Sequence, residues 1–146
     1  MSRKKVIAII PAREKSKRIP GKNYKNFNGI PIIINTIKKL KKSKLFDKII
    51  VSTDSDKISK IAKRHGAEIP FKRPKILSND YASGTAVISH CVKFLIKKGY
   101  KFDYVCCVYA PNPFLNVNDL KLGFKKIKTN KFYYVFAATP FRFPFF

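Results

Sequence analysis

Three short stretches of this chain are almost continuously apolar, at residues 6–10, 48–53 and 104–109. Stretches of this length and composition are typical of strands that are buried on both faces of a parallel sheet. Residues 67–71 and 133–139 carry similar but weaker patterns. The distribution of apolar residues therefore predicts five strands.

Between these strands, apolar residues recur at helical spacing. Ile33, Ile37 and Leu40 would share one face of a helix that begins at Pro31 and frays near Ser43. The same reasoning predicts three more helices: from Ser55 or Asp56 through His65, from Gly84 or Thr85 to just before Gly99, and from Asn116 or Asn118 through Ile127.

Strands and helices alternate along the whole chain, which is the pattern of an α/β fold. We expect a Rossmann-like, mostly parallel sheet with helices on both faces. No internal repeat, flexible linker or change of composition marks a boundary, so the sequence predicts one domain over residues 1–146.

The first predicted strand runs directly into a basic loop. This loop contains the cations Arg13, Lys17 and Lys22, the hydroxyl of Ser16, and a turn at Gly21. Backbone N–H groups in such a loop can point at phosphate oxygens while the cations neutralise the charge. On charge alone, a solvated basic loop after a strand is the simpler explanation of these residues.

Distinctive polar residues also follow the other predicted strands. Asp54 comes after the second strand, Arg73 after the third and Asn112 after the fourth. In an open α/β sheet, ligands bind outside the carboxyl ends of the strands. The sequence therefore predicts that these residues and the basic loop meet at one edge of the sheet.

The chain is strongly basic, with 32 Lys and Arg against 8 Asp and Glu in 146 residues and a net charge of +24. Such a charge can attract nucleic acid or an anionic membrane. The lysines are scattered among many Ile, Asn, Phe and Tyr residues, as an AT-biased genome would produce, so we interpret most of the charge as solvated surface. A non-enzymatic nucleic-acid-binding protein remains the alternative of another class, but the sequence carries no RNA-binding or recognition-helix motif.

The cysteines Cys91, Cys106 and Cys107 lack metal-ligand spacing. The two adjacent ones should point to opposite faces of a strand, which predicts buried free thiols in a reducing compartment. No apolar run is long enough to span a bilayer, and the N-terminus has no signal-peptide pattern. We therefore expect a cytoplasmic protein without a membrane partner.

The segment AREKSKRIPGKN, residues 12–23, resembles the nucleotide-binding signature of the acylneuraminate cytidylyltransferases. The likeness continues in order along the chain, and the pair Tyr109-Ala110 with the segment TPFRFP is most similar to family members that act on pseudaminic acid. The further matching segments are FDKIIVSTD, GAEIPFKRP, LSND and YAPNPFL, at residues 46–54, 66–74, 77–80 and 109–115.

This resemblance implies that the chain activates a nonulosonic acid, a sialic-acid-like sugar, with CTP. The anomeric hydroxyl of the sugar would attack the α-phosphorus of CTP, giving a CMP-sugar and pyrophosphate, with Mg²⁺ sharing the stabilisation of charge. It also implies that Arg13, Ser16, Lys17 and Lys22 hold the triphosphate, with Arg13 and Lys22 as the catalytic cations and Lys22 nearest the developing charge.

The other candidate residues are placed by the same resemblance. For Asp54 the resemblance leaves two interpretations open, a metal-related role or a carboxylate that caps a helix or the sheet edge. The resemblance implies a nucleotide contact for Asn23, a contact with the cytosine or ribose for Arg73, places in the nucleotide pocket for Asp80 and Thr85, and a sugar-side contact for Asn112.

The chain departs from the family pattern in two respects. Glu14 and Lys15 stand where members often have small residues, and Glu14 would repel phosphates if it pointed at them. Members also continue past the region matched here into a segment that carries an Asp-x-Asp metal pair and the dimer-forming part. We therefore expect a C-terminally truncated chain with an apolar tail at residues 141–146. Such a chain would keep the nucleotide pocket in part, would catalyse poorly or not at all, and would lack the segment that forms the homodimer usual in the family.

The identity of the sugar is left open by the sequence. Pseudaminic acid is the expected acceptor, and acylneuraminate, legionaminate and 3-deoxy-manno-octulosonate are the alternatives. The last is disfavoured by Ser16-Lys17-Arg18 and Lys22-Asn23, because enzymes for that sugar usually have a different loop after the Ala-Arg pair.

Overall fold

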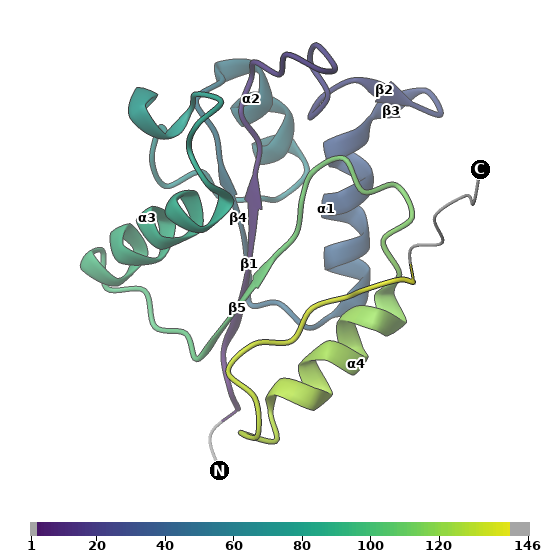
Figure 1. The fold of residues 1–146 in the computed structure, drawn as a ribbon, viewed down its shortest axis with the longest axis vertical. Helices are drawn as coiled ribbons and strands as arrows, with labels where there is room; N and C mark the ends of the chain where they lie inside the picture. Colours follow the sequence, from purple (N-terminus) through teal and green to yellow (C-terminus); the bar gives the residue numbers. More distant parts are fainter. Residues whose placement is uncertain (1–2, 141–146) are drawn as a thin grey trace, which may run out of the picture.

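A computed structural model of the chain describes residues 3–140. Figure 1 shows a central sheet with helices around it. In chain order the elements are β1 (Val6–Pro11), β2 (Asn26–Phe27), β3 (Ile30–Pro31), α1 (Ile32–Ser43), β4 (Lys48–Ser52), α2 (Asp56–Arg64), the 3₁₀ turn η1 (Lys75–Leu77), α3 (Gly84–Lys97), β5 (Tyr104–Cys107) and α4 (Val117–Ile127).

Three of the strands form a parallel sheet in the order β4-β1-β5, so β1 lies in the centre. Ile10 is in register with Val51 of β4, and Ile9 with Cys107 of β5. The strands β2 and β3 form a separate antiparallel hairpin before α1. The predicted parallel arrangement is confirmed.

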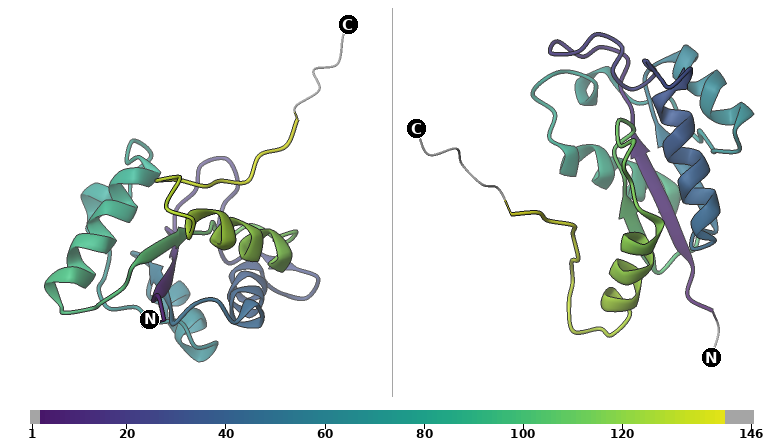
Figure 2. Two further views of the ribbon diagram at one scale, coloured as in Figure 1. Left: turned by 90° about the horizontal axis from the view of Figure 1, so that it is seen from below. Right: turned by 90° about the vertical axis from the view of Figure 1, so that its right-hand side faces the viewer.

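The central strand is buried on both faces. Ala8 and Ile10 pack against α1, α2 and α4, whereas Ile7 and Ile9 pack against α3. Figure 2 shows α3 on one side of the sheet and α1 and α4 on the other. The helices thus cover both faces, as the alternating pattern predicts for a Rossmann-like sheet.

Side-chain caps fix where the helices begin. Ser55 accepts a hydrogen bond from the N–H of Ile58 and starts α2, and Ser83 accepts one from Ala86 and starts α3. Asn116 does the same for α4. The structure therefore selects Ser55 over Asp56 and Asn116 over Asn118 as the capping residues.

The strand predicted at residues 67–71 is wrong. Only two isolated parallel bridges form beside β4, joining Ile50 to Glu68 and Thr53 to Lys72. Pro70 lies between them and has no N–H to give to a ladder, so the pairing is interrupted.

The strand predicted at residues 133–139 is also wrong. This segment is irregular in the structure, and Tyr133 is 95% exposed. Only Val135 is partly buried, and it lies close to Gly123 of α4, so the segment lies against a helix and not beside a strand. High β-propensity makes a strand only where an edge is within hydrogen-bonding reach. The apolar tail at residues 141–146 lies outside the described residues.

The three cysteines differ in exposure. Cys91 is buried on the face of α3 that packs against the sheet, and burial raises the pKa of its thiol to about 12. Cys106 is partly buried, and burial raises its pKa to about 11. The prediction of buried thiols is wrong for Cys107, which is exposed because β5 is the edge strand and α3 does not cover it.

Candidate functional site

The carboxyl ends of the three parallel strands lie at one edge of the sheet, shown at the top of Figure 1. From β1 the chain passes to β4 on one side, and it later enters β5 on the other side. This reversal of direction beside β1 is the place where ligands bind in open α/β sheets. The loops after β1 and β5 flank it.

The loop after β5 is anchored to α1. The hydroxyl of Thr36 donates a hydrogen bond of 2.7 Å to the carbonyl of Ala110, and the ammonium of Lys39 donates one of 2.6 Å to the carbonyl of Pro113. These bonds fix the backbone on either side of Asn112, which is partly buried in a turn. The predicted sugar-side residue is therefore held on a defined loop.

The basic loop, residues 13–23, is tied down at both ends. The side chain of Asn23, only 3% exposed, donates a hydrogen bond of 2.7 Å to the carbonyl of Arg13. The N–H of Glu14 donates a hydrogen bond of 2.9 Å to the Asp54 carboxylate. Asn23 and Asp54 therefore hold the loop in shape.

The far end of the basic loop folds back at Gly21. This residue has a φ of +64°, and its carbonyl accepts hydrogen bonds from the N–H groups of Tyr24 and Lys25. The Tyr24 ring lies against Gly21, and the ammonium of Lys57 lies 4.4 Å from the centre of that ring. The bend thus requires a residue without a Cβ.

The bend encloses a shallow hollow of about 290 Å³. Ser16 is partly buried in it, whereas Glu14 and Lys15 are exposed. Glu14 is one of the residues that line the hollow, so whether it repels phosphates stays a prediction. The residues lining it are Glu14, Lys15, Ser16, Lys17, Pro20, Gly21 and Tyr24.

Two predicted phosphate ligands share one carboxylate. Asp80 lies 2.6 Å from the guanidinium of Arg13 and 3.1 Å from the ammonium of Lys17. The hydrogen bond from Lys17 and then that from Arg13 lower the pKa of Asp80 below its ordinary value. Residues that are 67 and 63 positions apart in sequence are thus joined.

Arg73 is a buried cation beneath the basic loop. It is 5% exposed, and one of its terminal nitrogens donates a hydrogen bond of 3.0 Å to the carbonyl of Ser52. Its Nε has no hydrogen-bond partner among the described residues. Burial lowers the pKa of the guanidinium, Asp54 opposes this shift and Arg13 adds to it. Arg73 therefore lies within electrostatic reach of both Arg13 and Asp54.

The structure brings together some of the predicted site residues and leaves others apart. Arg13, Lys17 and Asp80 are in direct contact. Lys22 is partly buried in the last turn of the basic loop, and Thr85 is exposed in the first turn of α3. For these last two, no side-chain hydrogen bond or ion pair is found in residues 3–140.

Sequence reasoning missed three residues at this edge. Tyr24 closes the bend; its position three residues after Gly21 is the only signal for it. The hydroxyl of Tyr109, which belongs to a largely exposed side chain, reaches the start of α3, where a Cβ added to Gly84 would lie 2.8 Å from it. Ser52, fully buried at the end of β4, carries no sequence signal.

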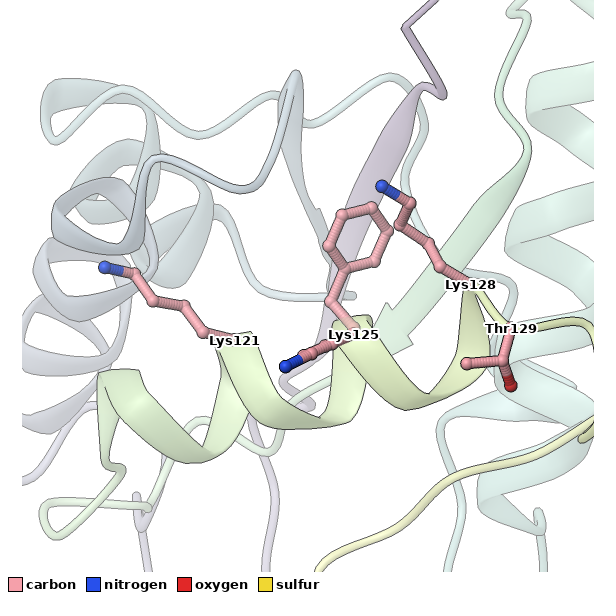
Figure 3. Close-up of a pocket in the computed structure, with 5 residues that line it drawn as sticks. Lys121, Lys125, Lys128 and Thr129 are labelled. Atoms are coloured by element: carbon pink, nitrogen blue, oxygen red, sulfur yellow. The ribbon is translucent and has the colours of Figure 1, made fainter.

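A second hollow, of about 320 Å³, lies on α4 at a distance from these loops. Figure 3 shows its lysines, Lys121, Lys125 and Lys128, pointing in different directions from the helix. Phe124 and Thr129 complete the lining. Because the ammonium groups do not converge, this hollow does not resemble a binding site.

Within the described part of the chain, no group of three or more His, Cys, Asp and Glu side chains could hold a metal ion. No helix of residues 3–140 has both the length and the apolar character needed to cross a membrane. Asp54, the one metal candidate from the sequence, already accepts the N–H of Glu14 with one oxygen.

Comparison with known proteins gives consistent results. Residues 7–143 match the family described as Cytidylyltransferase. The chain is 44% identical over 140 residues to a pseudaminic acid cytidylyltransferase of Campylobacter jejuni subsp. jejuni serotype O:23/36 (strain 81-176), covering 96% of this chain and 60% of that protein. It is 38% identical over 114 residues to a CMP-N,N'-diacetyllegionaminic acid synthase of Legionella pneumophila, covering 75% of this chain and 47% of that protein.

Solved structures agree in fold. The chain superposes on a CMP:2-keto-3-deoxy-manno-octonic acid synthetase complexed with CTP with a TM-score of 0.71, at 22% identity, covering 86% of this chain and 48% of that one. A cytidylyltransferase from Leptospira borgpetersenii gives a TM-score of 0.69 at 25% identity, covering 88% of this chain and 51% of that one.

Among the relatives found by sequence, the chain spans about 60% of the length of the pseudaminic acid cytidylyltransferase.

We predict that Arg73→Met leaves the free energy of unfolding unchanged or raises it by about 1–2 kcal/mol, because a buried cation with an unpartnered nitrogen is replaced by an apolar side chain. The Ser52 carbonyl still accepts the N–H of Ala12. Urea unfolding measures the effect, with the exposed Arg64→Met as control. A loss above about 2 kcal/mol would show that Arg73 is needed for stability.

We predict that Gly21→Ala destabilises the chain more than Gly29→Ala. Both residues have positive φ, so each alanine costs about 1–2 kcal/mol in backbone strain. At Gly21 the new Cβ would also lie 2.9 Å from the Tyr24 ring, whereas at Gly29 it would meet nothing within 4 Å. Equal losses in thermal unfolding of the two variants would contradict this account of the bend.

Proposed function

This chain belongs to the cytidylyltransferase family, and we propose that it binds CTP at the carboxyl edge of the sheet and activates a nonulosonic acid. Pseudaminic acid is the proposed acceptor, because the 44% identity is to an enzyme named for that sugar. The proposal treats the matched residues as a single nucleotidyltransferase domain. The observation that carries it is the basic loop, delivered by the central strand to this edge and tied there at both ends.

The triphosphate would lie along the basic loop. Arg13 and Lys17 supply positive charge on its first half, Lys22 on its last turn, and Ser16 a hydroxyl inside the hollow. Charge-assisted hydrogen bonds to phosphate oxygens are the strong ones, and Arg can make two at once. The hydrogen bond from the Asn23 side chain to the Arg13 carbonyl holds the two ends of this loop together.

The chemical step is an in-line displacement at the α-phosphorus. The anomeric oxygen of the sugar forms a bond to phosphorus, the bond to the oxygen that bridges the α- and β-phosphates breaks, and pyrophosphate leaves with the electron pair while the hydroxyl proton is released. Negative charge grows on the phosphate oxygens, and Arg13 and Lys22 would stabilise it. Holding the attacking and leaving oxygens in line with the α-phosphorus would also accelerate the reaction.

The nucleoside and the sugar would occupy opposite sides of the loop. Arg73 lies beneath the loop on the β4 side, which suits a contact with the cytosine or ribose. Thr85 in the first turn of α3 and the neighbouring Asp80 remain candidates for the nucleotide pocket. Asn112, on the anchored loop after β5, would contact the sugar.

Magnesium is part of the proposal only as an ion brought by CTP. Residues 3–140 do not form a metal site of their own, and Mg²⁺ commonly uses one or two carboxylates together with substrate phosphates and water. Asp54 is the candidate carboxylate, because only one of its two oxygens accepts a hydrogen bond, from the N–H of Glu14, among the described residues. The ion would supply further positive charge at the phosphates. Homodimer formation, usual in the family, also remains a proposal.

We predict that Arg13→Ala and Lys22→Ala each weaken CTP binding about tenfold or more, since each removes a charged hydrogen bond. Isothermal titration with CTP measures the affinity. Arg64→Ala and Lys42→Ala, which remove exposed cations near the ends of α2 and α1, are the matched controls and should change little. Unchanged CTP affinity in both site variants would refute the proposed function.

We predict that the CTP-saturated chain binds pseudaminic acid more tightly than N-acetylneuraminic, legionaminic or 3-deoxy-manno-octulosonic acid. Titration of each sugar measures this without requiring turnover. Tighter binding of legionaminic acid would instead assign the chain to the activity that its 38% identical relative is named for. Weak catalysis by this chain stays a prediction, and rapid CMP-sugar formation would contradict it.

A further inference from the structure

The contact between Asp80 and the basic loop has a specific geometry. Each carboxylate oxygen serves a different cation: Oδ1 accepts from Arg13, and Oδ2 lies 3.1 Å from Lys17. The side chain of Arg13 is 23% exposed and that of Asp80 is 32% exposed, so this pair is partly shielded from water. One carboxylate thus neutralises half of the positive charge of two proposed phosphate ligands.

Asp80 lies in a turn that is held by side-chain hydrogen bonds of Asn79. The side-chain oxygen of Asn79 accepts hydrogen bonds from the N–H groups of Tyr81 and Ala82, and its amide donates to the carbonyl of Ile76. Such an Asx turn fixes the backbone on both sides of residue 80. The carboxylate is therefore aimed at the loop by local structure, and it links the segment between η1 and α3 to the loop after β1.

A triphosphate and the Asp80 carboxylate would use the same donors. The N–H groups of Arg13 that face Asp80 cannot at the same time face a phosphate oxygen, and a carboxylate left beside a bound triphosphate would repel it. We propose that Asp80 is an internal counter-ion that occupies Arg13 and Lys17 until a polyphosphate displaces it. This inference rests on the proposed function and deepens it.

Displacement has two consequences. The apparent affinity for a phosphate ligand equals the intrinsic affinity multiplied by the fraction of molecules in which Asp80 has left the cations. Anions such as inorganic phosphate therefore also bind less tightly to these two cations, in a chain that carries a net charge of +24. Release of Asp80 also separates the segment before α3 from the basic loop, so phosphate binding and the position of this segment are coupled.

The test uses inorganic triphosphate and CTP as probes in isothermal titration. Asp80→Asn keeps the size of the side chain and removes its charge. We expect it to bind both probes about three- to tenfold more tightly than the unmodified chain, because two ion pairs of ordinary surface strength no longer compete. Asp103→Asn is the matched control, because it removes the same charge from a carboxylate that is paired with Lys4. Asp103 directly precedes β5 and so lies at the amino-terminal edge of the sheet, opposite the proposed site. This variant should change neither affinity.

A double-mutant cycle with Arg13 separates this role from a general charge effect. In the Arg13→Ala background only Lys17 remains paired, so Asp80→Asn should give a smaller gain than in the unmodified chain. Weaker binding by Asp80→Asn would overturn the proposal and make Asp80 a group that assists the nucleotide. An equal gain in Asp103→Asn would overturn it as well.

The two proposals fail differently. If neither Arg13→Ala nor Lys22→Ala weakens CTP binding, the proposed function is refuted. If Arg13→Ala weakens binding but Asp80→Asn fails to strengthen it, only the role of Asp80 as an internal counter-ion is refuted.

Discussion

The burial of β1 between β4 and β5 is the constraint on which the rest of the structure depends. A central parallel strand uses both of its edges for hydrogen bonds and both of its faces for apolar packing, so polar groups are confined to its ends, and the basic loop follows its carboxyl end. The basic loop is therefore placed by the sheet itself. The loop lies beside the reversal of strand order because the chain passes from β1 to β4 on one side and later enters β5 on the other side.

Few acidic side chains oppose the positive charge around the basic loop. Eight Asp and Glu residues face 32 Lys and Arg residues in the whole chain, yet Asp54 and Asp80 both lie against the basic loop. The first holds the backbone of the loop, and the second contacts its cations. Two carboxylates thus lie against the loop that is proposed to hold a triphosphate, and the buried Arg73 adds a cation nearby whose pKa is lowered by its burial.

Most of the fold could be predicted from the sequence, because local patterns and tertiary packing agree there. The runs around Ile9, Ile50 and Val105 are strands, and the helices begin within a residue or two of the predicted positions. The errors occur where β-propensity had no partner to satisfy it. Residues 67–71 contain Pro70, and residues 133–139 lie against α4 and not beside a strand.

What the sequence by itself determined is the basic loop, its place after the first strand and the family, since these depend on residue order and on the apolar pattern alone. Only the tertiary structure decided that Asp80 meets Arg13, that Asn23 turns inward and that Tyr109 reaches Gly84. The physical reason is that each of these contacts joins segments whose separation is set by the turns and crossovers between them. Local sequence propensities do not determine how far apart these segments lie in space, and the packing of the whole fold does.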